Sequence, residues 1–284
     1  MTVAVPADGR PARSRRPARP PRPGGLTRVS GLGLGVAMIW FSLLVLIPLA
    51  AVVVTGTETG WAEFWDAVTA EQTAAAIRLT VGMAVLVTAV NVVMGTLIAR
   101  VLVRDRFVGQ RVLEVLIDIP FALPTIVAGL VLLSLYGQDS PLGIDLANTR
   151  PAVMLAFLFV TLPFVVRTVQ PVLAELDREA EEAAASLGAS RVTTFRRVVL
   201  PSLTPAIAAG AALSFARAVS EYGSLVLLSG NLPFRTEVTS VRILSSIEND
   251  NLTNAAAVAT ILLAISLAVI VALDVVQRRI ARRG

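Results

Sequence analysis

Apolar and polar stretches alternate along the chain, and six apolar runs stand out. A helix needs about 20 residues to cross roughly 30 Å of hydrocarbon, and each run has close to that length. Because the backbone must satisfy its own hydrogen bonds inside a bilayer, these runs predict helices. The expected spans cover residues 34–54, 79–99, 116–136, 152–169, 204–228 and 255–276. The pattern predicts an all-α integral membrane protein with six transmembrane helices and both termini on one side.

A few polar or helix-breaking residues interrupt these runs. Pro120 and Pro124 are expected to break the start of the third span, because proline has no N–H and neighbours must satisfy the freed carbonyl groups. Asn91 in the second span is expected to form an interhelical hydrogen bond. The small side chains of residues 206–212 are expected to allow close helix packing.

Arg217 and Glu221 are charged residues four positions apart inside the fifth run. On a helix this spacing places them on one face. A charge near the centre of a spanning helix costs on the order of 3 kcal/mol, so neither side chain is expected to face lipid. Two interpretations stand: an ion pair that holds helices together, or a pair that lines a transport pathway. No catalytic residue and no metal site is expected.

The segments outside the runs differ in composition. Residues 1–30 hold seven arginines and six prolines, and we expect a disordered tail that meets anionic lipid rather than nucleic acid. Residues 31–284 form the transmembrane domain, with the first run retained as a helix rather than cleaved as a signal. Residues 60–71 are acidic and carry Trp61 and Trp65, which is typical of a helix at the membrane interface.

Composition agrees with a membrane protein and restricts its chemistry. Hydrophobic residues make up 55% of the chain and charged residues 16%, and the mean hydropathy is +0.74. There is no cysteine, histidine or lysine, so all 25 basic residues are arginine. A Walker A loop needs a lysine on the nucleotide phosphates, and Ser-His-Asp catalysis needs a histidine. The chain is therefore not expected to be an enzyme, and any ATP that drives it must be hydrolysed, with magnesium, on another subunit.

Arginines are unevenly distributed between the connecting segments. Seven lie in the tail, four in residues 100–114, four in residues 178–197 and four after residue 277. The alternate loops hold only Arg78, Arg150, Arg235 and Arg242. Because arginine and lysine are enriched in cytoplasmic segments, both termini and the two arginine-rich loops are predicted to be cytoplasmic.

The polar segment between the fourth and fifth runs predicts two short helices joined at a hinge. Apolar residues recur at steps of three and four from Leu173 to Leu187, which predicts a helix with one apolar face. Gly188 is expected to close that helix in a left-handed conformation. Ser190 is expected to cap a second helix, which Pro201 stops.

The spacing in this segment resembles the EAA loop of permeases from bacterial binding-protein-dependent ABC importers, the cytoplasmic loop that docks on the ATPase. That family has Glu-Ala-Ala, a glycine after three further residues, and Ile-x-Leu-Pro after nine more; here valine stands at position 198. The resemblance implies a type I ABC importer permease fold with a coupling loop at about 173–201. It implies ATPase-coupling roles for Glu182, Ala183, Ala184, Gly188, Phe195, Leu200 and Pro201. The plainer interpretation is a solvated connector between membrane helices.

Residues 117–137 and 220–238 are similar to the T-type permease family of sulfate/thiosulfate importers, and the resemblance covers about residues 30–280. It implies alternating access, with a second homologous permease, two ATP-binding cassette subunits and an extracytoplasmic sulfate-binding protein, in the inner membrane of a bacterial cell. Molybdate or tungstate permeases are the closest alternative in substrate. An ion-coupled secondary anion transporter is the alternative from another class, but among the acids only Glu221 is expected deep in a span.

Overall fold

The computed structural model describes residues 28–281, and the chain divides into two compact units, Met1–Pro48 and Leu49–Gly284. In the first unit, α1 (Arg28–Phe41) continues into a five-residue π-helical turn, η1 (Ser42–Leu46). These residues are predominantly apolar, as a membrane helix requires. All but the last three residues of the predicted tail lie outside the described part of the chain.

The second unit consists of helices and connecting loops, and no strand occurs between residues 49 and 281. The first of its helices starts at the end of the first unit. In chain order the helices are α2 (Ile47–Thr57), α3 (Trp61–Thr69), α4 (Glu71–Arg104), α5 (Gln110–Ala122), α6 (Thr125–Tyr136), α7 (Arg150–Glu175), α8 (Arg178–Ser186), α9 (Arg191–Thr194), η2 (Phe195–Val199), α10 (Leu200–Val219), α11 (Gly223–Leu228), α12 (Thr239–Glu248) and α13 (Leu252–Ala281).

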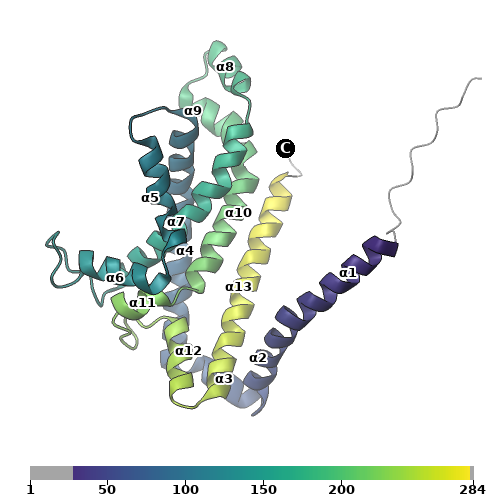
Figure 1. Ribbon diagram of the computed structural model, residues 1–284, viewed down its shortest axis with the longest axis vertical. Coiled ribbons are helices and arrows are strands. Elements are labelled where there is room, and N and C mark those ends of the chain that lie inside the picture. Colours follow the sequence, from purple (N-terminus) through teal and green to yellow (C-terminus); the bar gives the residue numbers. More distant parts are fainter. Residues whose placement is uncertain (1–27, 282–284) are drawn as a thin grey trace, which may run out of the picture. The chain divides into compact units, whose positions relative to one another are not determined.

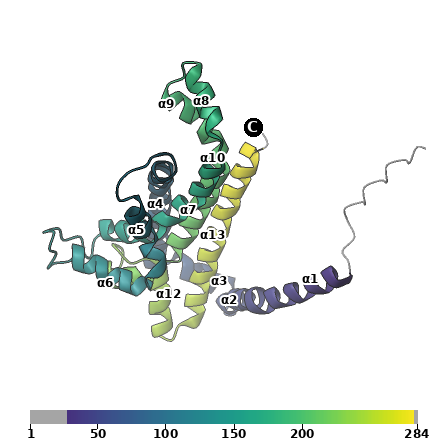
Figure 2. The same cartoon turned by 45° about the horizontal axis from the view of Figure 1, so that its top comes forward.

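Three long helices form the centre of the second unit. α7 packs along both α4 and α10, and these two also touch each other. α13 lies against α10, and α12 contacts both α13 and α4 (Figure 1, Figure 2). Buried apolar side chains fill the space between the helices in two clusters, one around Phe157 and Phe215 and the other around Leu173 and Leu203. The close packing of these apolar side chains holds the helices together and thereby positions their ends.

Glycines allow the central helices to approach closely. A Cβ added at Gly95 of α4 would lie 2.8 Å from Val165 Cβ in α7, and one added at Gly210 of α10 would lie 3.0 Å from Val165 Cα. Both distances are shorter than ordinary van der Waals contacts, so a larger side chain would force the helices apart. Gly210 belongs to the small-residue stretch 206–212, and the predicted close packing of this stretch is confirmed.

Asn91 joins the three central helices through its side-chain amide. It lies in α4 and is fully buried. Its Nδ2 donates to Thr161 Oγ1 in α7 (2.7 Å) and to Ser214 Oγ in α10 (3.2 Å). The predicted interhelical hydrogen bond is confirmed. Such a bond between buried faces fixes the register of the helices that share it.

Within residues 28–281, five helical segments are long and apolar enough to cross a membrane. They are Ser30–Thr57, Glu71–Arg104, Arg150–Glu175, Arg191–Val219 and Leu252–Arg279. These segments correspond to the first, second, fourth, fifth and sixth predicted runs, and most of them extend past the apolar core of the run. The third run corresponds to α5 and α6, and six spans result when this bent pair is counted as one.

The third predicted span is not a straight helix. α5 and α6 meet at an angle of 119°. The break falls at Leu123, which is extended (φ −87°, ψ 134°) because the following Pro124 disfavours a helical conformation at that position. α5 has 13 residues, so at about 1.5 Å per residue it covers only part of a bilayer. The predicted break is confirmed, whereas the continuous helix over 116–136 was wrong; Pro120 stays inside α5.

The fifth predicted span is interrupted as well. α10 ends at Val219, and residues 220–222 separate it from α11. The prediction of one helix over 204–228 was therefore wrong in its last part. Glu221 lies just beyond the end of α10 instead of on its helical face, because the chain turns there to start a new short helix.

The two interruptions lie side by side, because α6 packs along α11. A Cβ added at Gly223 would lie 2.8 Å from Ile126 N, and one added at Gly129 would lie 2.7 Å from Ser224 Cα. Contacts at these distances with backbone atoms tolerate no side chain. The start of α11 is therefore fitted against α6 by glycines on both helices.

The two ends of the second unit carry different segments. Figure 1 shows α8, α9 and the C-terminal end of α13 at one end, with α3 and α12 at the other. The arginine distribution assigned these same groups to opposite sides of the membrane. That the end with α8 and α9 is cytoplasmic stays a prediction.

α3 is the helix expected from the tryptophan-containing segment. Trp61 and Trp65 are exposed, whereas Phe64 and Val68 are buried against the rest of the unit. The predicted helix is confirmed. Its position at a membrane interface stays a prediction, supported by indole rings that point away from the protein core.

Candidate coupling surface and intramembrane charges

The EAA-like segment forms a helical hairpin at one end of the second unit. α8 begins after Asp177, whose side chain accepts a hydrogen bond from Glu179 N (3.0 Å). No residue of α8 is buried. Glu182 and Ala183 are exposed there. Glu182 and Ala183 are therefore not packed into the bundle. That they contact an ATPase stays a prediction.

The sequence predicted one helix for the apolar repeat from Leu173 to Leu187, but the repeat is divided between two helices. α7 ends at Glu175, and Leu176 takes an extended conformation (φ −72°, ψ 122°). Leu173 is fully buried, whereas the Leu187 side chain is 89% exposed. The prediction was wrong because Asp177 is a strong N-cap, which starts a new helix within a repeat of unchanged spacing.

Gly188 closes α8 in the way the sequence predicts. Its φ is +82°. Its N–H donates to Ala185 O (2.9 Å), and Ala189 N donates to Ala184 O (3.0 Å). These two bonds form a Schellman motif, in which a left-handed residue satisfies the last carbonyl groups of a helix. No atom lies within 4 Å of a Cβ added at Gly188, so conformation and not space requires the glycine.

Ser190 caps the second helix, as predicted, since its Oγ accepts from Thr193 N (3.2 Å). α9, η2 and α10 then continue as one helical segment. The prediction that Pro201 stops this helix was wrong. η2 is a π-helical turn in which Leu200 N bonds to Phe195 O. The widened turn directly before Pro201 accommodates a residue without an N–H, which is a known cause of such bulges.

The hairpin is tied to the end of α4 by arginines. Arg104 Nη2 lies 2.7 Å from Glu181 Oε1, and Nη2 also donates to Leu176 O (3.0 Å). In the other direction, Arg178 Nη2 donates to Val103 O (3.3 Å). The side chains of the ion pair are 13% and 20% exposed, so solvent screens it less than a surface pair.

A hollow beside the hairpin collects further charge. Arg100 of α4 lies over the ring of Phe195, with its guanidinium carbon 4.6 Å from the ring centroid. A contact of this kind contributes about 0.5–1 kcal/mol near a surface. The hollow has a volume of about 510 Å³, and Glu182 and Arg191 are also among its lining residues. It lies next to the exposed α8, and together they suit a protein partner with charged side chains.

The structure brings Arg217 and Glu221 together. Arg217 Nη2 lies 2.7 Å from Glu221 Oε2, and the two side chains are 27% and 0% exposed. Glu221 Oε1 accepts from Ser224 N (2.9 Å) and Ser224 Oγ (2.8 Å). The ion pair expected from the four-residue spacing is present, whereas its role, in helix packing or in a transport pathway, stays a prediction. The same carboxylate also satisfies the first turn of α11.

Sequence reasoning missed a second intramembrane pair. Arg167 of α7 meets Asp118 of α5 through two parallel contacts, Nε to Oδ1 (2.7 Å) and Nη2 to Oδ2 (2.6 Å). Both residues lie inside predicted apolar runs. The cost of charge within a span, which singled out Arg217, applies to these residues equally and was the signal that identifies them.

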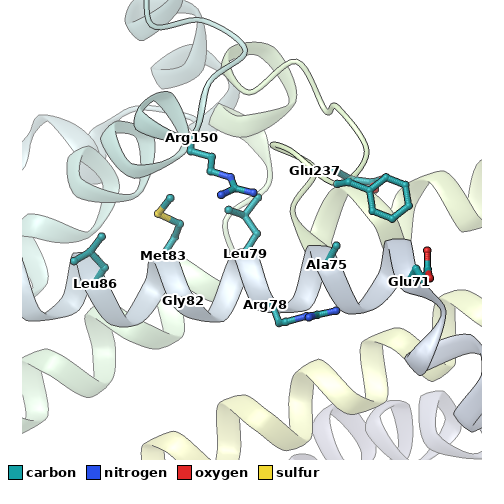
Figure 3. A pocket seen from close by; sticks show the side chains of 10 residues that line it. Glu71, Ala75, Arg78, Leu79, Gly82, Met83, Leu86, Arg150 and Glu237 are labelled. Carbon is teal, nitrogen blue, oxygen red and sulfur yellow. The ribbon is translucent and has the colours of Figure 1, made fainter.

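A cavity with a volume of about 710 Å³ lies toward the other end of α4. Figure 3 shows Arg150 and Met83 on one side of α4 and Arg78 on the other. Glu71 and Glu237 also line the cavity. Two carboxylates thus balance two guanidinium groups, and the cavity has no excess positive charge for an anion.

The geometry defines a membrane protein with an exposed helical hairpin at one end. Residues 91–283 match the family described as binding-protein-dependent transport system inner membrane component, and the chain belongs to this family. The curated relatives are more specific. The sulfate transport system permease protein CysT of Salmonella typhimurium is 43% identical over 259 residues, 89% of this chain and 94% of that one. The Synechocystis protein of the same name is 42% identical over 250 residues, 86% of this chain and 87% of that one.

Solved structures show the same fold at low sequence identity. A bacterial ABC transporter involved in the import of the acidic polysaccharide alginate superposes with a TM-score of 0.74 at 16% identity, covering 88% of this chain and 95% of that one. The MetNI methionine ABC transporter gives a TM-score of 0.57 at 18% identity, covering 72% and 94%. The predicted all-α type I ABC importer permease fold is confirmed.

Proposed function

We propose that this chain is the membrane-spanning permease subunit of an ATP-driven sulfate/thiosulfate importer. The observation that carries the proposal is the identity of 41–43% to sulfate transport system permeases over nearly nine tenths of the chain. Identity at this level over most of both chains favours a shared substrate class as well as a shared fold. In this function the anion crosses by alternating access between two conformations.

The exposed hairpin is the docking element for the ATPase in this proposal. Glu182, Ala183 and Ala184 lie on α8. Gly188 fixes the angle between α8 and α9 through the Schellman motif. Leu200 and Pro201 follow the π-helical turn that joins the hairpin to α10. Movement of the hairpin is thereby transmitted to a central helix directly, and to α4 through Arg104.

The chain is expected to work within a larger assembly. Two ATP-binding cassette subunits supply ATP hydrolysis with magnesium, a second homologous permease completes the pathway, and an extracytoplasmic binding protein delivers the anion. The membership of the binding-protein-dependent family supports this set of partners. The arginine distribution supports an orientation with the hairpin in the cytoplasm of a bacterial cell and the chain crossing the inner membrane several times.

The alternatives from the sequence have less support. No relative named above carries molybdate or tungstate in its name. An ion-coupled secondary transporter would not need a hairpin shaped to dock on another subunit, whereas no residue of α8 is buried in this chain. The ABC importer therefore explains both the comparisons and the exposed helix.

Uptake of labelled sulfate by cells that express the complete importer, and lack other sulfate uptake, tests the proposal. We expect ATP-dependent uptake that unlabelled thiosulfate competes more strongly than molybdate, and co-purification of an ATPase subunit with this chain. Uptake competed mainly by molybdate would reassign the substrate. Transport that persists without any co-purifying ATPase would contradict the ABC assignment itself.

A further inference from the structure

The two intramembrane arginines differ in how many of their donors are used. Arg167 engages every guanidinium nitrogen: Nε and Nη2 contact Asp118, Nη1 donates to Gln170 Oε1 (2.7 Å), and Nη2 also donates to Glu114 O (3.1 Å). Four of its five N–H donors are used and both edges of the guanidinium are occupied, so no free pair of donors is left for an oxyanion. Arg167 is therefore a brace between α5 and α7.

Arg217 is bound along one edge only. Its Nη2 meets Glu221 Oε2 at 2.7 Å. Among residues 28–281, no protein atom accepts a hydrogen bond from its Nε or Nη1. Arginine presents five N–H donors in a rigid fork that suits oxyanions. One edge of this fork is held in place, and the other is available.

Glu221 does not fully compensate the charge of Arg217. The carboxylate is shared with α11, because Oε1 accepts from both Ser224 N (2.9 Å) and Ser224 Oγ (2.8 Å). Its main-chain oxygen accepts from Ser240 Oγ (2.7 Å), which fixes the residue from a third element. A rigidly held carboxylate on one side thus aims the guanidinium and leaves net positive character on its free side.

The free edge of Arg217 is accessible. Its side chain is 27% exposed. Leu213, four residues earlier on the same face of α10, is exposed. Ser220, just past the end of the helix, is exposed as well. An arginine within a span that faced hydrocarbon would carry a high cost, so this strip of α10 faces water or another protein surface in the assembled transporter. In a transporter, a water-facing charge of this kind marks the route of the ion.

We infer that Arg217 is an anion ligand within the translocation pathway, and that Glu221 is the positioning residue that aims it. The inference rests on the proposed function, which supplies a tetrahedral oxyanion as cargo. The free Nε and Nη1 edge binds two oxygens of the anion as it passes, and the remaining neighbours of Glu221 keep that edge in place when the anion leaves. A ligand that binds through one edge also releases readily, as transport requires.

The test is the complete importer carrying Arg217→Gln together with Glu221→Gln, which removes the guanidinium without leaving a buried charge unpaired. We expect assembly and binding-protein-stimulated ATP hydrolysis close to wild type. Sulfate imported per assembled complex should fall about tenfold or more, the effect of losing charge-assisted hydrogen bonds to the anion. Hydrolysis without matching import is a result that a purely structural role would not produce.

Asp118→Asn with Arg167→Gln is the matched control, since it neutralises the other intramembrane pair; its import per assembled complex should match wild type. Arg217→Lys is the second variant, because it keeps the charge and loses the fork; we expect import reduced several-fold at normal assembly. Import at the wild-type rate per complex in the double Gln variant, or in Arg217→Lys if the double variant fails to assemble, would overturn the inference. Failure of the wild-type importer to take up sulfate would instead count against the proposed function.

Discussion

Arg104, the last residue of α4, lies 2.7 Å from Glu181 in α8. An otherwise exposed helix is thus anchored to a central helix of the bundle by an ion pair that is mostly shielded from solvent. Leu176 O takes a further bond from the same guanidinium (3.0 Å), so the arginine also holds the turn between α7 and α8. The helical hairpin is thus fixed to the end of α4 at two points.

We predict that Glu181→Gln weakens this anchor. The loss should be about 1–2 kcal/mol, because the pair is largely shielded and charge-assisted. Thermal unfolding of the purified protein in detergent should show a lower midpoint, and less ATPase should co-purify. Arg278→Gln is the control, since it removes an ion pair with Asp274 whose side chains are 73% and 45% exposed. A midpoint lowered equally by the two variants would show that the Arg104 pair is no more than a surface contact.

We predict that Gly188→Val disrupts coupling while sparing insertion. A β-branched side chain at φ +82° costs about 1–2 kcal/mol locally and opens the Schellman motif. Membrane levels should stay near normal, whereas co-purifying ATPase and sulfate uptake should fall sharply. Gly188→Asn is the matched control, because asparagine tolerates the left-handed region. Equal loss in both variants would mean that the backbone conformation is not what matters.

Glu182→Lys tests the surface of the same hairpin without changing its backbone. Glu182 is exposed and lines the hollow together with Arg191. A lysine at this position replaces a negative charge with a second positive charge beside Arg191, on the surface where a partner would dock. Immunoblots of membranes should show normal levels, and pull-down of the ATPase should be reduced several-fold. Wild-type pull-down and uptake would favour the interpretation of this segment as a solvated connector.

We predict opposite effects for alanine at two glycines of α4. Gly95→Ala places a Cβ 2.8 Å from Val165 Cβ and should destabilise the protein by about 1–3 kcal/mol through overpacking. Gly82→Ala meets no atom within 4 Å and should stabilise the helix by about 0.5–1 kcal/mol. Unfolding midpoints measured side by side decide the matter. A lower midpoint for Gly82→Ala than for Gly95→Ala would contradict the close packing of α4 on α7.

Much of the fold was predictable from sequence because a bilayer imposes length and hydropathy on every span. The hinge was equally local: Gly188 and Ser190 act through their own backbone and side chain, which spacing alone reveals. What failed was the effect of proline on helices. Pro124 follows a break in the chain, whereas Pro201 follows a π-helical turn within a continuing helix, and Pro120 lies inside α5. The position of a proline in the sequence therefore does not show whether a helix breaks or continues there.

The intramembrane charges show a second limit of sequence reasoning. Their cost was computable for all four residues, yet only Arg217 and Glu221 stood out, because their spacing suggests a pair within one helix. Arg167 and Asp118 are 49 positions apart. Contacts between segments far apart in the sequence depend on how the helices pack, and the spacing of residues along the chain does not show this. For the same reason, sequence could not tell which arginine keeps a free edge.

The interruptions of the third and fifth spans meet where Gly129 faces Ser224 and Gly223 faces Thr125. Neither short helix has room to slide over the other, so the two breaks make up a single mechanical joint. A rearrangement of α6 must displace α11, and with it the carboxylate of Glu221 that α11 shares with Arg217. We therefore expect that any movement of α6 or α11 also moves the buried carboxylate of Glu221.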